Sequence, residues 1–370
     1  MWHQTVHNSL LHSPVERTSK KGGRKNSTTE LADPRAFRGT REEVTPLFLP
    51  NSTQTELRSS VDNLKLHSNS TEEYLRGSLS TQVIPSLYIT IIVTGIPPNV
   101  AILVFLVANL RMTSYAILYC SLALSDLFLL VSLIFKTHYH FNGNNWVFGE
   151  ISCRLTTACF YGNLYCSMFT LTCISVKRYL AVVHPFLYKR LPKHAGSTWA
   201  SLTVWVIFAM TMLPELLIDQ SYKISNLDIT TCHDVLPDSQ QFTKLWISYN
   251  LGLTCIGFLL PLLVTVGCYA SVIWHLNQSQ LDWSAYIKAS GIVFVIFLVC
   301  FMPSSCLHFL HYMGLYTTGQ ENFYAYFNLA VCLCCLHSSL DPFLFLLMPS
   351  SVSSKLYIMG HKGKNLILSL

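Results

Sequence analysis

Hydrophobic residues are spread unevenly along this chain. Residues 1–82 are mostly polar or charged, whereas long apolar stretches fill most of 83–347. A helix needs about 20 apolar residues to cross a hydrocarbon core of about 30 Å. The pattern predicts an all-α membrane protein, with a disordered N-terminal segment, a bundle of seven transmembrane helices and a short tail, 348–370. The seven stretches lie at about 84–109, 114–138, 151–183, 198–218, 246–274, 284–312 and 323–347.

The third stretch is predicted to be the central helix of the bundle. It has no charged residue from Leu155 to Val176, yet small and hydroxyl side chains are mixed through it. A helix that faces only lipid has no use for them, whereas they let neighbouring helices approach closely and hydrogen bond. These residues are Thr156, Thr157, Gly162, Ser167, Thr170, Thr172 and Ser175.

Charge sets the expected location and orientation. Only 12% of the residues are charged, about half the share found in soluble proteins. Basic residues gather on one side of the predicted membrane, where cytoplasmic connections carry the excess of Lys and Arg. We therefore expect a multi-pass plasma-membrane protein with an extracellular N-terminus, and no nucleic-acid partner. The basic residues are Arg111, Lys177, Arg178, Lys189, Arg190, Lys193, Lys288, Lys355, Lys362 and Lys364.

Cysteines and glycosylation sequons fit this orientation. Of 13 cysteines, only Cys153 and Cys232 map to the outer side, where an oxidising environment is expected to join them as a disulfide. Sequons at Asn26, Asn51 and Asn69 are expected glycan acceptors. The first residues have no apolar core of a signal peptide. Either the first helix inserts as a reverse anchor, or the natural N-terminus lies outside this sequence.

Two carboxylates fall inside predicted membrane helices, at Asp126 and Asp341. A charge at this depth is costly and faces the bundle interior. Ser167 and Ser338 could complete an oxygen-rich site for a sodium ion, or the group could act as a proton-linked switch. The alternative is a structural pair in which one protonated carboxyl hydrogen bonds to the other. No other cofactor and no other metal site is expected.

Helix motifs give the chain a family resemblance. As a set, they resemble class A G-protein-coupled receptors: Asn99, Asp126, Cys153, Arg178, Trp205, Pro261, Pro303 and the D-P-F-L-F run from Asp341. More specific motifs resemble the proteinase-activated receptors of that class. These are HFNGNNWVFGE (140–150), FYGNLYCS (160–167), DITTCHDVLP (228–237) and the HPF run from His184. The resemblance implies that a protease cuts the outer segment, and that the new N-terminus folds back as a tethered agonist.

The predicted cleavage site follows Arg35. A trypsin-like specificity pocket requires Arg or Lys, and Pro34 fixes an extended backbone before the bond. Cleavage would expose a ligand that begins Ala36-Phe37-Arg38-Gly39, although Arg38 and Arg41 are competing sites. The resemblance also implies a thrombin exosite element downstream; the alternative is a random mixture of polar and apolar residues. Its residues are Glu42, Glu43, Pro46 and Phe48.

Residues at both ends of the bundle are also expected to have functional roles, Asp234 because it lies two positions after Cys232 in an acidic outer loop. Asp234 is the expected partner of Arg38 or of the new α-amine, and Arg178 is expected to couple to a heterotrimeric G protein. Two departures are Lys177, where most such receptors have an acid, and Phe345, where tyrosine is usual. The expected ligand-binding residues are Tyr161, Tyr165, His233, Asp234, Leu236, Leu307, His311, Tyr312 and Tyr326.

Three functions remain open at this point. The leading hypothesis is a receptor activated by thrombin or another trypsin-like protease. The second is a non-signalling cofactor that captures thrombin for a neighbouring receptor in a heteromer, and the third is a receptor for a soluble peptide. Membrane lipid is the remaining expected partner. No Ser/His/Asp or Cys/His arrangement stands out, so an enzyme is not expected.

Overall fold

Seven helices of a computed structural model are long and apolar enough to cross a membrane. The structure describes residues 37–41, 63–66, 69–108, 114–237, 251–277, 291–318 and 324–346. In that part of the chain the seven spans confirm the helix bundle predicted from the sequence. They are Thr71–Ala108, Ser114–Phe141, Glu150–Val183, Lys193–Leu217, Leu251–Asn277, Gly291–Leu310 and Ala325–Phe345.

Some spans are single helices, and others join several elements, among them short turns of π-helix that are labelled η. The first span joins α2 (Asn69–Arg76), η1 (Leu79–Val83) and α3 (Ile84–Ala108). The next three are α4 (Ser114–Phe141), α5 (Glu150–Val183) and α7 (Lys193–Leu217), with the short helix α6 (Pro185–Arg190) between the last two. The remaining spans contain η2 (Cys255–Leu259), α9 (Leu260–Asn277), η3 (Phe297–Phe301), α11 (Met302–Thr318), α12 (Tyr324–Cys335) and α13 (His337–Leu346).

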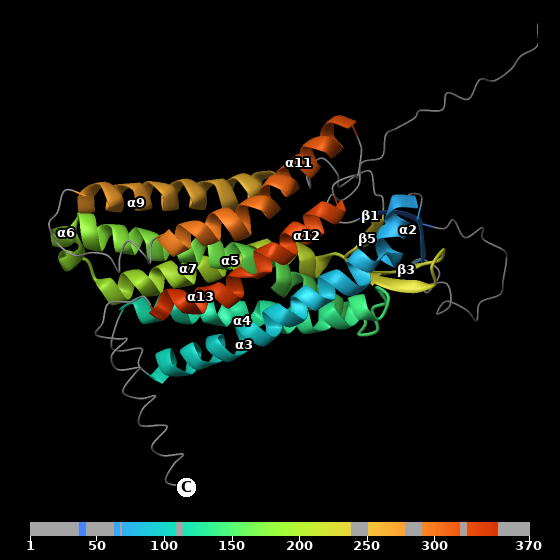
Figure 1. Cartoon of the computed structure of the whole chain (residues 1–370), viewed down its shortest axis with the longest axis horizontal. Coiled ribbons are helices and arrows are strands. Elements are labelled where there is room, and N and C mark those ends of the chain that lie inside the picture. The colour runs from blue at the N-terminus through green and yellow to red at the C-terminus, as the bar shows by residue number, and fades with distance from the viewer. Residues whose placement is uncertain are drawn as a thin grey trace, which may run out of the picture. The chain divides into compact units, whose positions relative to one another are not determined.

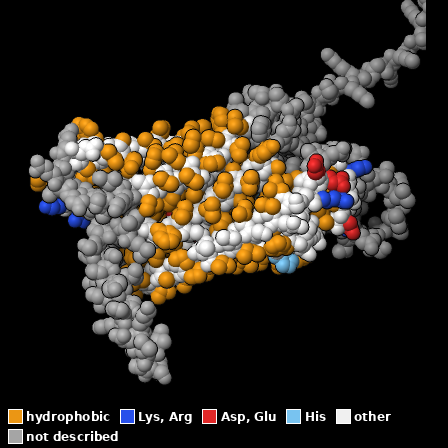
Figure 2. Space-filling view, in the orientation of Figure 1, with side chains coloured by type: hydrophobic (Ala, Val, Ile, Leu, Met, Phe, Trp, Pro, Cys, Tyr) orange, Lys and Arg blue, Asp and Glu red, His pale blue; other side chains and the backbone are white. Residues whose placement is uncertain are grey.

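Helix α5 lies at the centre of the bundle, as its sequence predicts. It contacts α4, α7 and α9. Gly162 shows how close the α7 contact is, because a Cβ built there would lie 2.5 Å from the sulfur of Met212. Hydrophobic side chains cover the visible middle of the bundle, and charged side chains gather at its two ends (Figure 2). That arrangement is what a bundle in a bilayer requires.

A small sheet covers one end of the bundle, next to α2 (Figure 1). Its five strands are β1 (Phe37–Arg41), β2 (Asn63–Leu66), β3 (Ser221–Ile224), β4 (Ile229–Cys232) and β5 (Val235–Pro237). Their order is β4-β3-β2-β1-β5. The two strands from before the first membrane helix therefore lie between strands of the loop that follows α7. We call this end the disulfide end, and the opposite end the α6 end.

Regular structure begins earlier than the sequence predicts. Residues 1–82 show no sustained periodicity, yet β1, β2, α2 and most of η1 lie within them. The strands have only five and four residues, and β2 pairs with β3 about 160 positions later in the chain. Such distant partners leave no local signal in a short polar segment. The tail 348–370 lies outside the described residues.

Candidate functional site at the disulfide end

A disulfide fixes the loop after α7 to the start of α5. Cys153 and Cys232 are bonded, with their Cα atoms 5.7 Å apart, which confirms the predicted pair. Both cysteines are buried beside Trp146 and Tyr139. The backbone N–H of Trp146 also donates to the carbonyl of Thr230, at 2.7 Å. The end of β4 is therefore held by a covalent bond and by backbone pairing.

Glu150 anchors the other end of the same loop. Its two carboxylate oxygens accept the backbone N–H groups of Gln220 and Ser221, each at 2.8 Å. Arg154, one helical turn later, donates from Nε to Glu150 at 2.6 Å and also pairs with Asp219. A carboxylate that accepts backbone N–H groups forms strong, charge-assisted hydrogen bonds. The start of β3 is thus fixed to the first turn of α5.

Strand β1 contains most of the predicted tethered ligand, and it pairs with this fixed loop. β1 runs parallel to β5, with Phe37 opposite Val235, Arg38 opposite Leu236 and Gly39 opposite Pro237. Its other edge pairs antiparallel with β2, where Arg41 lies opposite Leu64. Backbone hydrogen bonds on both edges hold the strand in one register. Leu236, a predicted ligand-binding residue, therefore lies in the strand beside Arg38.

The sheet must curl around its central strands. Cys232 in β4 and Val235 in β5 are three positions apart, which spans at most about 11 Å of extended chain. In a flat sheet the two outer strands would lie about 19 Å apart, four spacings of about 4.8 Å. His233 makes the bend with a φ of 69°. One loop therefore supplies strands on both sides of β1 and β2.

Asp234 lies one residue before β5 and is buried. The hydroxyl of Tyr139 donates to its carboxylate at 2.7 Å. A cavity of about 10 Å³ is lined by Asp234 together with Lys136, His140 and Tyr161. Lys136 is also buried, and its Nζ lies 4.6 Å from the centre of the Phe160 ring. The predicted acidic residue is therefore part of a polar cluster under the sheet, and sequence reasoning missed Lys136 in it.

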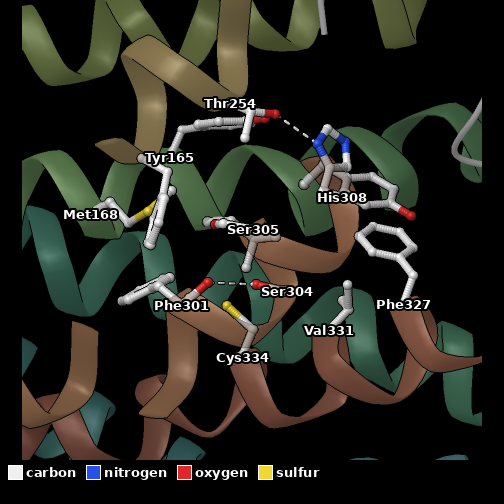
Figure 3. A pocket seen from close by; sticks show the side chains of 13 residues that line it. Tyr165, Met168, Thr254, Phe301, Ser304, Ser305, His308, Phe327, Val331 and Cys334 are labelled. Carbon is white, nitrogen blue, oxygen red and sulfur yellow. Dashed lines mark hydrogen bonds between the residues drawn. The ribbon is translucent and has the colours of Figure 1, made fainter. Parts of the chain in front are cut away.

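A second cavity lies deeper, between α5, η2, α11 and α12 (Figure 3). Its volume is about 50 Å³, far below the 300–1,000 Å³ typical of small-molecule sites. Tyr165 and Met168 lie on one side of it, and His308 and Phe327 on another, with His308 hydrogen bonded to Thr254 at 2.7 Å. A peptide cannot enter this space without movement of the surrounding helices.

The predicted ligand-binding residues occupy different places. Tyr161 lines both cavities, and Tyr165 lines the deeper one. His233 is buried, with its Nδ1 2.6 Å from Oε1 of Gln220 and its ring 5.0 Å from that of Tyr161. Leu307 is half-buried against the hydrophobic cluster that includes Phe160 and Phe327. The side chains of His311 and Tyr312, in α11, lie outside the described part.

Tyr326 is not brought to either cavity. Its side chain is 64% exposed, whereas the next residue, Phe327, is buried and lines the deeper cavity. Successive residues of a helix point about 100° apart, so only one of the two can face inward. The sequence alone did not fix the rotation of α12 and so did not single out Phe327 as the inward aromatic residue; ligand contact by Tyr326 stays a prediction.

The predicted cation site is a buried cluster with one unexpected member. Asp126, His337 and Asp341 offer ligand atoms within 4.8 Å of one another. Ser167 donates to Asp126 at 3.3 Å, as does the side-chain amide of Asn163 at 3.2 Å. Both carboxylate oxygens of Asp341 lack a hydrogen-bond partner among the described residues. A hydrogen bond between the two carboxyl groups, the structural alternative, is therefore not formed.

His337 is a member of this cluster that the sequence analysis did not predict, and Ser338 as a ligand stays a prediction. The hydroxyl of Ser338 donates to the carbonyl of Cys335 at 2.8 Å, whereas Nε2 of His337 lies 3.5 Å from Asp126. Residues four apart on a helix share a face, so the spacing of His337 and Asp341 was a usable signal. The ring of Phe301 lies 4.8 Å from that of His337. Because Phe301 also lines the deeper cavity, one aromatic contact links the two sites.

At the α6 end, Arg178 is held by a phenol. Its guanidinium donates to the hydroxyl of Tyr119 at 2.8 Å, and that hydroxyl donates to the carbonyl of Leu344 at 3.4 Å. Phe345 packs edge-on against Tyr119. These contacts fix Arg178 to α4 and α13 without an adjacent acid.

Several predicted sites lie outside the described residues. They are the cleavage site Arg35 and Ala36, the exosite residues Glu42, Glu43, Pro46 and Phe48, and the sequons at Asn26 and Asn51. Asn69 is the first residue of α2, and its glycosylation stays a prediction.

Comparison with known proteins identifies the family. The family model of the 7 transmembrane receptor (rhodopsin family) matches residues 98–345. Proteinase-activated receptor 3 from Bos taurus is 44% identical over 283 residues, which cover 76% of this chain and 74% of that protein. The same receptor from Homo sapiens is 42% identical over 280 residues, 76% of this chain and 75% of that protein.

A second group of relatives is more distant. Proteinase-activated receptor 2 from Bos taurus is 36% identical over 279 residues, 73% of this chain and 70% of that protein. These relatives are receptors, and with the seven apolar helices they identify a multi-pass protein of the plasma membrane. The chain therefore belongs to the rhodopsin family of seven-transmembrane receptors and, within it, to the proteinase-activated receptors.

Proposed function

We propose that this chain is a G-protein-coupled receptor activated by cleavage after Arg35. Thrombin or another trypsin-like protease makes the cut, and the new N-terminus, Ala36-Phe37-Arg38-Gly39, acts as the tethered agonist. Glu42, Glu43, Pro46 and Phe48 form the protease exosite in this proposal. Arg178 contributes to coupling with a heterotrimeric G protein at the α6 end. The names of the relatives support protease activation in general.

The pairing of β1 with β5 carries the proposal. Three of the four proposed ligand residues, Phe37, Arg38 and Gly39, are opposite residues of a loop strand that directly follows the disulfide. An extended segment that adds to a sheet gains affinity from its backbone hydrogen bonds. Cleavage after Arg35 would leave this pairing intact and change only the chain just before it.

The parallel register favours Asp234 as partner of the new α-amine rather than of Arg38. Paired parallel strands run in the same direction, and Phe37 is opposite Val235. The amine would form one residue before Phe37, and Asp234 lies one residue before Val235. Asp234 already accepts a hydrogen bond from Tyr139 within the cavity shared with Lys136. A new charge at this position would therefore disturb an existing buried cluster.

Aromatic side chains lie between that polar cluster and the cation cluster of Asp126, His337 and Asp341. Tyr161 lines both cavities, Phe301 lies at the deeper one, and its ring contacts His337. Two π-helical turns, Cys255–Leu259 and Phe297–Phe301, each contribute a side chain, Phe258 and Phe301, to the wall of the deeper cavity. Such turns are frequent at functional sites. We infer that ligand contact at the mouth repacks Phe301 and, through it, the cation cluster.

We also propose that Asp126, Ser167 and Asp341 hold a sodium ion, with Ser338 as a further oxygen. The residues fit such an ion, because two buried carboxylates have oxygens without hydrogen-bond partners in the described part. A bound cation would offset the cost of those charges. Thermal unfolding of the purified receptor should shift upward with sodium but not with choline. Asp126→Asn should remove the shift, and an equal shift in both salts would contradict the site.

The decisive experiment measures cleavage and signalling together. Cells that express the receptor with an N-terminal tag are treated with thrombin, and tag release and cytosolic calcium are recorded. Arg35→Gln should abolish both at unchanged surface expression, whereas Arg41→Gln, the matched control, should abolish neither.

The same experiment separates the alternatives. Tag release without calcium would instead support the non-signalling cofactor that presents thrombin to a neighbouring receptor. Calcium that does not require Arg35 would support a receptor for a soluble peptide.

A further inference from the structure

A large groove at the α6 end has no role in the function proposed above. It lies between α5, α6 and α7, and its volume is about 380 Å³, which is within the range of small-molecule sites. Apolar side chains form most of its wall, together with Lys177, Tyr188, Lys193, Gly196 and Ser197. We call it the inner groove.

The inner groove contains two cations and no anion. Lys177 is only 9% exposed. Its Nζ donates to the hydroxyl of Ser197 and lies 4.3 Å from the centre of the Tyr115 ring. Lys193 Nζ lies 4.8 Å from the centre of the Tyr188 ring. Within the described residues no carboxylate lies in ion-pair range of either ammonium.

An ammonium buried in this way needs an anion. Ring faces and a hydroxyl compensate only part of its lost hydration, and a lysine has three N–H donors. Lys177 uses one of them on Ser197. A carboxylate that approached along the groove could accept the others, in a pair shielded from water by the apolar wall. The lining is therefore complementary to a molecule with a small anionic end and a long apolar body.

We propose that the inner groove binds a long-chain fatty acid as its carboxylate anion. The carboxylate pairs with Lys177, with Lys193 at the groove's edge, and the chain lies along the apolar wall. A single chain suits a space of this volume better than a two-chain phospholipid does. A carboxylate is also small enough to reach an ammonium that is almost fully buried, whereas a phospholipid headgroup is not.

The test measures binding of oleate to the purified full chain in detergent micelles. Oleate should bind saturably, and methyl oleate, which has the same chain without charge, should bind at least about tenfold more weakly. Lys177→Met removes the charge at similar volume, and should weaken oleate binding by a similar factor, the effect of one charge-assisted hydrogen bond. Lys189→Met is the control, because Lys189 lies on α6 and does not line the groove.

A second variant blocks the space without touching the lysine. A Cβ built at Gly196 meets no atom within 4 Å, so Gly196→Leu should fold and fill the groove, and leucine also favours the helix. Gly267→Leu, at an equally open position in α9, is its control. Loss of oleate binding only in Gly196→Leu supports the proposal. Equal binding of oleate and methyl oleate, unchanged binding in Lys177→Met, or equally strong competition by an anionic phospholipid would overturn it.

Discussion

The two ends of α5 are held by opposite kinds of contact. At the disulfide end, the cation in the first turns of α5, Arg154, pairs with two carboxylates, those of Glu150 and Asp219. At the α6 end, Lys177 and Arg178 are buried against a hydroxyl and a phenol. A charge that already has its counterion fixes structure, whereas a buried charge without one can change partner at lower cost. We call the fixed region at the disulfide end, held by the Cys153–Cys232 bond and by Glu150 and Arg154, the frame. The α6 end is suited to switching.

The disulfide is the strongest test of the frame. Cys153→Ala and Cys232→Ala should give equal, large losses of surface receptor, because a bridge that closes a long loop contributes about 2–5 kcal/mol. Surface antibody staining measures the loss. Near-normal staining of either variant would mean that Glu150 and the sheet fix the loop without the bond.

Asp234 tests whether the frame also recognises the ligand. Asp234→Asn keeps the shape and removes the charge, and a charge-assisted hydrogen bond is worth about 1.5–3 kcal/mol. The response to a soluble AFRG peptide should therefore shift to about 10- to 150-fold higher concentration. Tag release by thrombin should not change.

A matched peptide separates the two cations of the ligand. N-acetylation of the peptide removes the positive charge of its α-amine. The arginine at its third position, which corresponds to Arg38, stays charged. If Asp234 pairs with the amine, acetylation should weaken the wild-type response and have little further effect on Asp234→Asn. An unshifted curve in the variant would make Asp234 a purely structural residue of the buried cluster.

Glu150 should matter less, since part of its side chain is exposed. Glu150→Gln removes the negative charge of a carboxylate that accepts hydrogen bonds from two backbone N–H groups and from Nε of Arg154. We expect a loss of about 1.5 kcal/mol, measured as a lower midpoint of thermal unfolding in micelles. Glu72→Gln, in an exposed pair with Arg76, is the control and should have no effect. A similar loss in both variants would contradict a special role for Glu150.

Tyr119 probes the end suited to switching. Tyr119→Phe removes the acceptor of Arg178 and leaves the ring contact with Phe345. A lost buried hydrogen bond costs about 1 kcal/mol, so basal G-protein activation should rise by a few fold as Arg178 is freed. Tyr115→Phe is the control, because the contact with Lys177 is through its ring face. Unchanged basal activity in Tyr119→Phe would show that this contact does not restrain the receptor.

The smallest effect is expected at an exposed ion pair of the disulfide end. A hydrogen bond from Lys223 holds the pKa of Asp228 below its usual range. A lowered pKa adds stability above the unfolded-state pKa, about 3.9, and that stability is lost as pH falls through the folded value. Because Asp228 is 84% exposed, solvent screens the pair. Asp228→Asn should leave the unfolding midpoint unchanged at pH 7. A clear decrease there that disappears near pH 3 would make this pair part of the frame.

The sequence predicted the helices well because each one is defined locally. A run of about 20 apolar residues has one stable place, whatever its neighbours do. The strands around the proposed ligand could not be found in this way. β1 is held by pairing with β5, about 200 positions later in the chain. The pattern of only five residues cannot indicate so distant a partner.

Side-chain orientation was hardest to predict where the rotation of a helix decides it. Tyr326 and Phe327 are equally aromatic, and only the packing of α12 selects the inward one. On α13 the sequence did not single out His337, which offers a ligand atom beside the two carboxylates. The disulfide between Cys153 and Cys232 was predicted correctly because these were the only two cysteines expected on the outer side of the membrane.

The position of β1 inside the sheet has a consequence for pharmacology. With β2 on one side and β5 on the other, β1 offers no free edge to an added peptide. A soluble agonist must displace β1 from its place in the sheet. Because β1 is part of the same chain, its effective concentration at that place stays high at any protein concentration. Soluble peptides should therefore look weak on the intact chain, and a receptor that lacks residues 37–41 is the form in which their true potency can be measured.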